Sequence, residues 1–124
     1  MTVLVDSWAW IEYFKGSTPG LKAGEIIESG RKLLLSTINI SEIYFFLLRN
    51  KPAEADKLIN FVLSSSFVIS IDSRIALKAA KIKQIQKLGL ADAIVIATAE
   101  ENNATILTGD DDFKNSKNVI YIGK

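Results

Sequence analysis

Short apolar runs alternate along the chain with longer segments whose apolar residues recur at helical spacing. The short runs have the length of buried strands, and we expect strands at 3–5, 33–35, 67–71, 105–107 and 119–122. The longer segments predict helices over 7–14, 21–29, 40–49, 52–64, 73–88 and 91–101, with a loop at 17–20. Strands that are apolar on both faces and separated by helices favour an α/β fold, in which helices cover both faces of a parallel sheet.

Four acidic residues stand where such a fold gathers functional groups. Asp6 directly follows the first predicted strand, and Asp110 follows the strand at 105–107. Glu42 and Asp92 stand near the starts of two helices that are otherwise apolar. Because sites in parallel sheets form beyond the carboxyl ends of the strands, we expect these four carboxylates to lie close together at one edge of the sheet.

Each of these acids also has an ordinary structural interpretation. Asp6 and Asp92 can serve as helix N-caps, and the acidic run at 110–112 can be a solvated turn. Glu42 suits a cap less well, because Asn39 or Ser41 is the better capping residue. The four acids together, at strand ends and helix starts, favour one shared site over four separate caps.

The composition limits the chemistry that this site can perform. The 124 residues include no cysteine and no histidine, which excludes disulfides, thiolate or imidazole metal ligands and a Ser-His-Asp triad. The net charge of +1 by itself indicates neither a nucleic-acid nor a membrane partner. No stretch is typical of a targeting or membrane-spanning segment, and we expect one domain over residues 1–124, located in the cytoplasm.

Carboxylates brought together in this way need a counter-charge. Two carboxylates about 4 Å apart repel by about 4 kcal/mol at an effective dielectric constant near 20. Either some of them hold protons or a hard cation neutralises them. A site made only of oxygen ligands suits Mg²⁺ or Mn²⁺, which bind through a few carboxylates together with substrate phosphates.

Four blocks of the sequence, in order, resemble the PIN-domain family, and most closely its VapC-type toxin ribonucleases. The first block is an apolar strand followed by an aspartate, a hydroxyl residue and an apolar helix. The other three carry Glu42, Asp92 and Asp110. In one-letter code the blocks read VLVDSWAWI (3–11), STINISEI (36–43), LGLADAIVIATA (88–99) and TGDDDF (108–113).

The resemblance implies a three-layer α/β/α sandwich and a metal-dependent endoribonuclease. By this similarity, Mg²⁺ or Mn²⁺ would be held by four catalytic carboxylates, those of Asp6, Glu42, Asp92 and Asp110. The hydroxyls of Ser7 and Thr108 match positions that support the family's site through hydrogen bonds. Asp112 stands two residues beyond Asp110 and can share its role, whereas Asp111 and Phe113 are expected in a solvated turn and in packing, respectively.

The resemblance also implies partners: an RNA substrate, a second copy in a homodimer and an antitoxin protein. Two alternatives remain open, namely a PIN nuclease of RNA processing or decay without an antitoxin, and a non-catalytic binding module with the same fold.

Aromatic and basic residues add two further expectations. Aromatic side chains crowd the predicted helices 7–14 and 40–49, where they serve either the core or an interface. The lysines at 78–87 are typical of a solvated helix face, whereas Lys114 and Lys117 are candidates for contacts with RNA phosphates.

Overall fold

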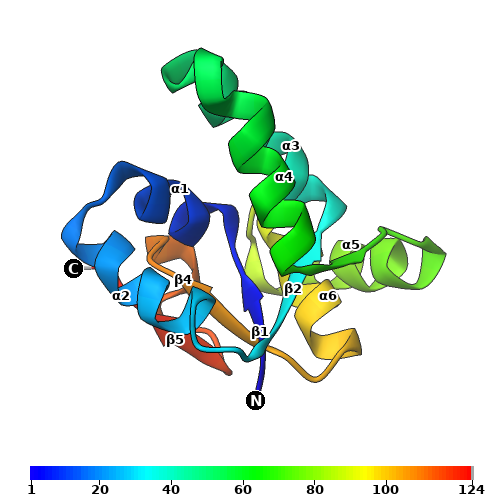
Figure 1. Cartoon of the computed structure of the whole chain (residues 1–124). Helices are drawn as coiled ribbons and strands as arrows, with labels where there is room; N and C mark the ends of the chain where they lie inside the picture. Colours follow the sequence, from blue (N-terminus) through cyan, green and yellow to red (C-terminus); the bar gives the residue numbers. More distant parts are fainter. Residues whose placement is uncertain (124) are drawn as a thin grey trace.

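Five parallel strands form one sheet in the order β3-β2-β1-β4-β5. The computed structural model describes residues 1–123 (Figure 1). The strands are β1 (Thr2–Val5), β2 (Lys32–Ser36), β3 (Phe67–Ile69), β4 (Thr105–Thr108) and β5 (Val119–Tyr121). All five predicted strands are therefore present, and the third is two residues shorter than expected.

The helices connect the strands as the sequence pattern predicts. They are α1 (Ser7–Lys15), α2 (Thr18–Ile27), α3 (Thr37–Asn50), α4 (Ala55–Ser65), α5 (Ser73–Gln86) and α6 (Leu90–Glu101). Two short 3₁₀ turns, η1 (Pro52–Glu54) and η2 (Asp111–Phe113), complete the described elements. Within residues 1–123, no helix has the length and apolar character that crossing a membrane requires.

Two helix starts differ from the sequence prediction because side chains cap them earlier than expected. The loop predicted at 17–20 is wrong beyond its first residue: the Ser17 hydroxyl accepts from the backbone N–H of Gly20, 3.1 Å away, and starts α2 at Thr18. Helix α3 begins at Thr37, three residues before the predicted position, since Ser36 and Asn39 form a reciprocal capping box.

The helices form one layer on each face of the sheet, which confirms the α/β/α sandwich (Figure 1). Helices α1 to α4 pack on one face, against side chains such as Val3 and Val5 of β1. Helices α5 and α6 pack on the other, against the intervening Leu4. Alternate residues of a strand point to opposite faces, so the short apolar strands supply both cores at once.

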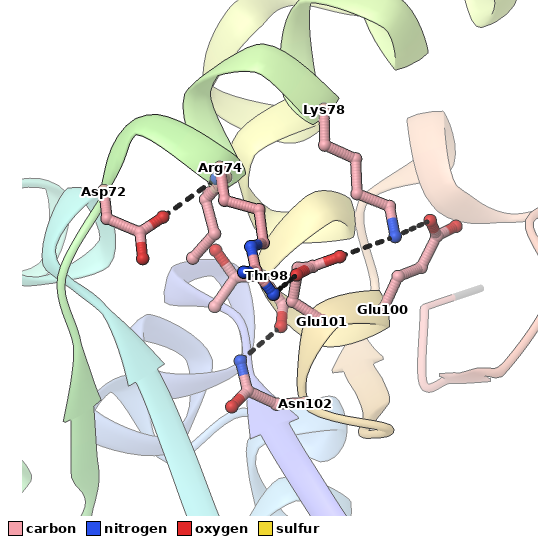
Figure 2. A network of polar contacts seen from close by, with 8 residues as sticks. Asp72, Arg74, Lys78, Thr98, Glu100, Glu101 and Asn102 are labelled. Atoms are coloured by element: carbon pink, nitrogen blue, oxygen red, sulfur yellow. Dashed lines mark hydrogen bonds and ion pairs between the residues drawn. The ribbon is translucent and has the colours of Figure 1, made fainter.

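Ion pairs tie α5 to α6 on the outer surface of the second layer. Figure 2 shows Lys78 between Glu100 and Glu101, with N–O distances of 3.2 and 3.1 Å, and Arg74 at 3.7 Å from Glu101. Asp72 caps α5, as predicted, by accepting from the backbone N–H of Ile75. These contacts help to fix α6 and therefore the position of Asp92 in its first turn.

The strand order places a topological switch point between β1 and β4. From β1 the chain moves outward to β2 and β3, and it then crosses back to add β4 on the other side of β1. The connections leaving the carboxyl ends of β1 and β4 therefore go to opposite sides. Such a point leaves a crevice at the edge of the sheet, and Asp6 and Asp110 both follow strands that end there.

Replacing Gly20 by alanine is expected to lower the free energy of unfolding by about 1–3 kcal/mol, the usual cost of overpacking. A Cβ atom at this position would overlap the backbone carbonyl of Glu12, and a backbone group cannot move aside as a flexible side chain can. Urea denaturation measures the effect. The control is Gly89→Ala, since a Cβ there meets no atom within 4 Å. Equal stability of the two variants would contradict this close approach of α1 and α2.

Candidate metal centre

The Asp6 carboxylate lies buried at the end of β1, where two side chains orient it. Its Oδ2 accepts a hydrogen bond from the Thr108 hydroxyl at 2.9 Å, and its Oδ1 accepts from the Asn39 amide at 3.3 Å. The Thr108 oxygen in turn accepts from the backbone N–H of Asp110 at 3.1 Å. Asp6 is only 5% exposed, so these bonds fix its orientation with little competition from water.

Glu42 reaches the same region from α3. Its Oε1 accepts a hydrogen bond from the Ser7 hydroxyl at 2.6 Å. Ser7 is the first residue of α1 and directly follows Asp6 in the chain. The Asn39 amide lies 3.5 Å from the Ser7 oxygen as well as 3.3 Å from Asp6. One hydrogen-bond network therefore joins the acid of β1 to the acid of α3.

Three further carboxylates complete the acidic centre, which we define as Asp6, Glu42, Asp92, Asp110 and Asp112. Asp92, Asp110 and Asp112 each offer an oxygen, and these oxygens lie within 4.8 Å of one another. Asp110 accepts from the backbone N–H of Asp112 at 2.9 Å, which folds the turn after β4 toward α6. The sequence assigned Asp112 a secondary part, whereas the structure places it directly beside Asp92 and Asp110.

The pKa values of two of these acids show how strongly the centre resists negative charge. Burial raises the pKa of Asp6 from 3.8 to about 6; the Thr108 hydrogen bond opposes this rise, and the charges of Glu42 and Asp110 add to it. Burial likewise raises the pKa of Asp92 from 3.8 to about 7, with further contributions from the charges of Asp110 and Asp6 and from contact with Asp112.

The capping interpretation does not account for Asp6 or Asp92. Asp6 precedes α1, but its side chain forms no capping hydrogen bond. Asp92 is the third residue of α6, two residues beyond the first helical position, and the capping position belongs to Gly89. Its place in the first turn lets the positive end of the helix dipole stabilise the carboxylate without a capping bond.

The donor set fits a hard divalent cation. All five groups are carboxylates, and oxygen is the ligand atom that Mg²⁺ and Mn²⁺ prefer. None of the ion pairs formed within residues 1–123 involves any of the five. No lysine or arginine therefore pairs with them in the described chain, and the raised pKa values of Asp6 and Asp92 are consistent with uncompensated charge.

Residues around the centre take the positions that their sequence context indicated. Phe113 is fully buried in the core, and Asp111 is exposed, where it accepts from the Tyr121 hydroxyl. Among the lysines of α5 and its C-terminal end, Lys78 pairs with glutamates of α6, and Lys83 donates to the carbonyl of Leu88 at 3.1 Å. These two lysines therefore have structural contacts of their own.

The aromatic residues divide between core and surface. Trp10 is fully buried and packs against Tyr13, Phe14 and Phe61, with ring centroids 5.8 to 6.1 Å apart. Phe45 of α3, by contrast, is 62% exposed. The core interpretation therefore holds for Trp10 and the rings around it, and the interface interpretation remains a prediction for exposed rings such as Phe45.

Two cavities flank the acidic turn. One, of about 840 Å³, runs along α6 beside Asp112 and is lined by Ile96 and Glu100 of the helix, by Asn103 just beyond its end, and by Lys117. Ile96 and Glu100 follow Asp92 on one stripe of α6, four and eight positions further on. The other cavity, of about 660 Å³, opens beside Asp110 and is bordered by Trp8 and Tyr121.

Asn39, which the sequence suggested only as a helix cap, also contacts the acidic centre. It is fully buried and bonds to the Ser36 backbone, to Asp6 and to Ser7. It precedes Glu42 by three residues, so both side chains lie on the same face of α3. That spacing, read together with the expected position of Glu42, is the signal that could have identified it.

Comparisons with known proteins place this geometry in a family context. The family model of the PIN domain matches residues 3–118. A chain of a toxin–antitoxin complex from Klebsiella pneumoniae is 25% identical, with a TM-score of 0.83 and 98% of each chain covered. No curated protein sequence matches.

Two more distant structures share the fold. VapC20 of Mycobacterium tuberculosis, described as a sarcin-ricin loop cleaving toxin, is 17% identical, with a TM-score of 0.78 over 94% of this chain and 96% of that one. VapBC-1 from nontypeable Haemophilus influenzae is 18% identical, with a TM-score of 0.76 and complete coverage of both chains.

Proposed function

The chain belongs to the PIN domain family, and from this membership we propose that it is a metal-dependent endoribonuclease, the toxin of a type II toxin–antitoxin pair. PIN domains and their VapC relatives are in general nucleases, and the similar structures include toxin–antitoxin complexes. The observation that carries the proposal is the acidic centre, in which oxygens of Asp92, Asp110 and Asp112 lie within 4.8 Å of one another and close enough to Asp6 for charge repulsion. Within residues 1–123, no ion pair neutralises these carboxylates.

We propose that Asp6, Glu42, Asp92 and Asp110 are the catalytic and metal-holding residues, with Mg²⁺ or Mn²⁺ as the ion. Asp112 belongs with them because its carboxylate lies against Asp92 and Asp110. When bound, the metal would lower the pKa of a water molecule and stabilise the charge that develops on the phosphate. The chain itself supplies a fixed set of oxygen ligands in a site without histidine.

Hydroxyl and amide groups hold these carboxylates in place. Thr108 links Asp6 to the turn that carries Asp110, and Ser7 holds Glu42. Ligands fixed by such bonds bind a cation without first losing side-chain freedom, and loss of an outer hydrogen bond typically costs 10–100-fold in metal affinity or activity. We assign Ser7, Thr108 and Asn39 this orienting role.

An RNA strand is the substrate that fits the surroundings of the centre. The groove along α6 leads from Asp112 past amide and hydroxyl side chains to Lys117. Lys114, three residues before Lys117, has its Nζ 5.7 Å from the centre of the Tyr121 ring. Phosphates flanking the scissile bond could therefore meet a lysine beyond the acidic centre.

We also propose an antitoxin partner, a homodimer and one domain over residues 1–124 acting in the cytoplasm. The antitoxin follows from the toxin–antitoxin complexes among the similar structures. Exposed apolar side chains on α3, including Phe45 and Leu48, offer surface for a protein contact. The family match over residues 3–118 supports a single PIN domain.

RNA cleavage by the purified chain tests the proposal. Cleavage is expected in the presence of Mg²⁺ or Mn²⁺ and its loss in excess EDTA, and a calorimetric titration with Mn²⁺ should show binding. Expression of the chain alone should arrest growth, and co-expression of an antitoxin encoded beside it should restore growth. Cleavage without growth arrest would favour a processing nuclease, whereas metal-independent RNA binding without cleavage would favour a non-catalytic module.

Replacing Ser7 by alanine is expected to lower the cleavage rate about tenfold and to weaken Mn²⁺ binding to a similar extent. The substitution removes the hydroxyl that donates to Glu42 at 2.6 Å and leaves that carboxylate free to turn. The rate is measured at saturating Mg²⁺ and the affinity by calorimetry. Ser64→Ala removes an exposed hydroxyl on α4 and serves as the control. Wild-type values for Ser7→Ala would exclude an orienting role for this bond.

A further inference from the structure

The cavity beside Asp110 has a lining that the metal chemistry does not use. We call it the Trp8 pocket and define it by Trp8, Glu12, Pro19, Gly109, Asp111 and Tyr121; its volume is about 660 Å³. It shares Asp111 with the groove along α6, and Asp110 belongs to its border. A group bound in it would therefore sit next to the proposed scissile phosphate.

Two glycines without side chains, Gly109 and Gly123, shape this pocket. A Cβ atom on Gly109 would overlap the six-membered ring of Trp8, so the indole packs directly on the turn that carries Asp110. A Cβ atom on Gly123 would overlap the Tyr121 hydroxyl and crowd the carbonyl oxygen of Gly109. Glycine at both positions allows the close approach of the two aromatic side chains to the backbone around the opening.

The polar lining consists of hydrogen-bond acceptors whose charge is partly compensated. Glu12 accepts from the Ser17 hydroxyl at 2.8 Å and pairs with Lys15 at 3.1 Å. Asp111 accepts from the Tyr121 hydroxyl. Each carboxylate has two oxygens with several acceptor positions, so both keep capacity for a ligand that donates hydrogen bonds. A phosphate would be repelled here, whereas a flat, neutral ligand with several N–H groups fits the lining.

We propose that the Trp8 pocket binds a guanine base of the RNA, in a nucleotide adjacent to the scissile phosphate. The base would stack on the Trp8 indole, an interaction that every nucleobase can make. Selectivity would come from Glu12 and Asp111, because the Watson–Crick edge of guanine presents two neighbouring donor groups, N1–H and N2–H₂. Adenine, cytosine and uracil each present a single donor group there. This inference rests on the proposed ribonuclease function and adds a base preference to it.

Nucleotide binding without metal tests the pocket independently of catalysis. The chain has two tryptophans, and Trp10 is fully buried, so quenching of indole fluorescence by an added base reports on Trp8. We expect half-maximal quenching by GMP at a concentration about fivefold or more lower than for AMP, CMP or UMP. One good pair of acceptors discriminates between bases by at least this much. The ribose phosphate is common to all four nucleotides, so any difference in quenching between them is due to the base.

Variants separate stacking from recognition of the base edge. Glu12→Gln is expected to remove most of the preference for GMP, while Glu25→Gln, the same change on the exposed surface of α2, leaves it intact. Trp8→Leu should weaken the binding of all four nucleotides about tenfold, as measured by calorimetry, and Trp8→Phe should largely restore this affinity. Should Trp8→Leu fail to fold, the Glu12→Gln and Trp8→Phe measurements still test whether the pocket binds guanine.

The outcomes distinguish this proposal from the ribonuclease function. Cleavage of short RNAs that differ in one base should favour guanine beside the cut, and Glu12→Gln should reduce that preference without changing Mn²⁺ affinity. Equal quenching by all four nucleotides, or quenching by none, overturns the guanine site even if RNA is cleaved. Tighter binding of N-acetyl-argininamide than of GMP also overturns it, in favour of a cationic peptide side chain. Preferential GMP binding by a chain that cleaves no RNA would uphold the pocket and contradict the ribonuclease.

Discussion

Replacing Asp92 by asparagine is expected to lower metal-dependent RNA cleavage by at least about a hundredfold and to raise the melting temperature of the metal-free protein at pH 8. Asp92 offers one of the three carboxylate oxygens that lie within 4.8 Å of one another, so the substitution removes one oxygen of the proposed metal site. Without metal, however, the same carboxylate is repelled by Asp110 and Asp6 and is partly desolvated. The neutral amide relieves that repulsion and can donate a hydrogen bond to Asp112.

The two readouts of this variant must move in opposite directions. A variant that merely unfolds would lose activity and melting temperature together, whereas removal of a metal ligand lowers only the first. Asp72→Asn is the matched control, because it makes the same chemical change at the cap of α5, where asparagine also caps well. Full cleavage activity of Asp92→Asn in Mg²⁺ would show that the acidic centre is not the site of the reaction.

Stability of the metal-free protein is expected to fall as the pH rises from 5 to 8. The pKa values of Asp6 and Asp92 in the folded chain, about 6 and about 7, lie above their ordinary value of 3.8. The folded state therefore holds these protons more tightly than the unfolded state. The resulting stabilisation is complete below about pH 4 and is lost as the pH rises through 6 and 7. For the buried Asp6 alone, the rise in pKa from 3.8 to about 6 corresponds to about 3 kcal/mol of free energy of unfolding, at 1.36 kcal/mol per pKa unit.

Mg²⁺ is expected to reverse this trend, since it competes with protons for the same oxygens. Thermal unfolding at pH 5 and pH 8, with and without millimolar Mg²⁺, should show stabilisation by the ion at pH 8 and little at pH 5. The chain contains no histidine, so no imidazole titrates in this interval and obscures the result. Metal-free stability that is flat or rises toward pH 8 would contradict the proposed crowding of carboxylates.

The sequence was sufficient to predict the order of elements and the edge of the sheet that carries the acids. Apolar triplets such as Val3–Val5 are short and uninterrupted, and this pattern reflects burial on both faces of a parallel strand. Asp6 directly follows such a run and Asp110 stands two residues after β4, so their place at the carboxyl edge follows from chain direction alone. Local capping was less predictable: with Ser17 and Ser36 as their caps, α2 and α3 each begin earlier than the apolar pattern predicts.

The details of the acidic centre depend on contacts between residues distant in the chain. Thr108 and Asp6 are 102 positions apart, and Asn39 and Asp6 are 33 apart. Spacing within one element indicates which face a side chain occupies, but it carries no information about which neighbour that face meets. For this reason the proximity of Asp112 to Asp92, and the hydrogen bond from the capping residue Asn39 to Asp6, could be seen only in the packing of the folded chain.

By itself, the sequence determined the α/β alternation, the exclusion of cysteine and histidine chemistry, and the family, because these follow from local pattern, from composition and from four ordered blocks. Only the tertiary structure decided which carboxylates touch and how far burial raises the pKa of Asp6 and Asp92. It also decided that Trp8 lies over Gly109 beside a cavity. The physical reason is that desolvation, charge repulsion and steric contact depend on distance in space, which the packing of the two helical layers on the sheet establishes.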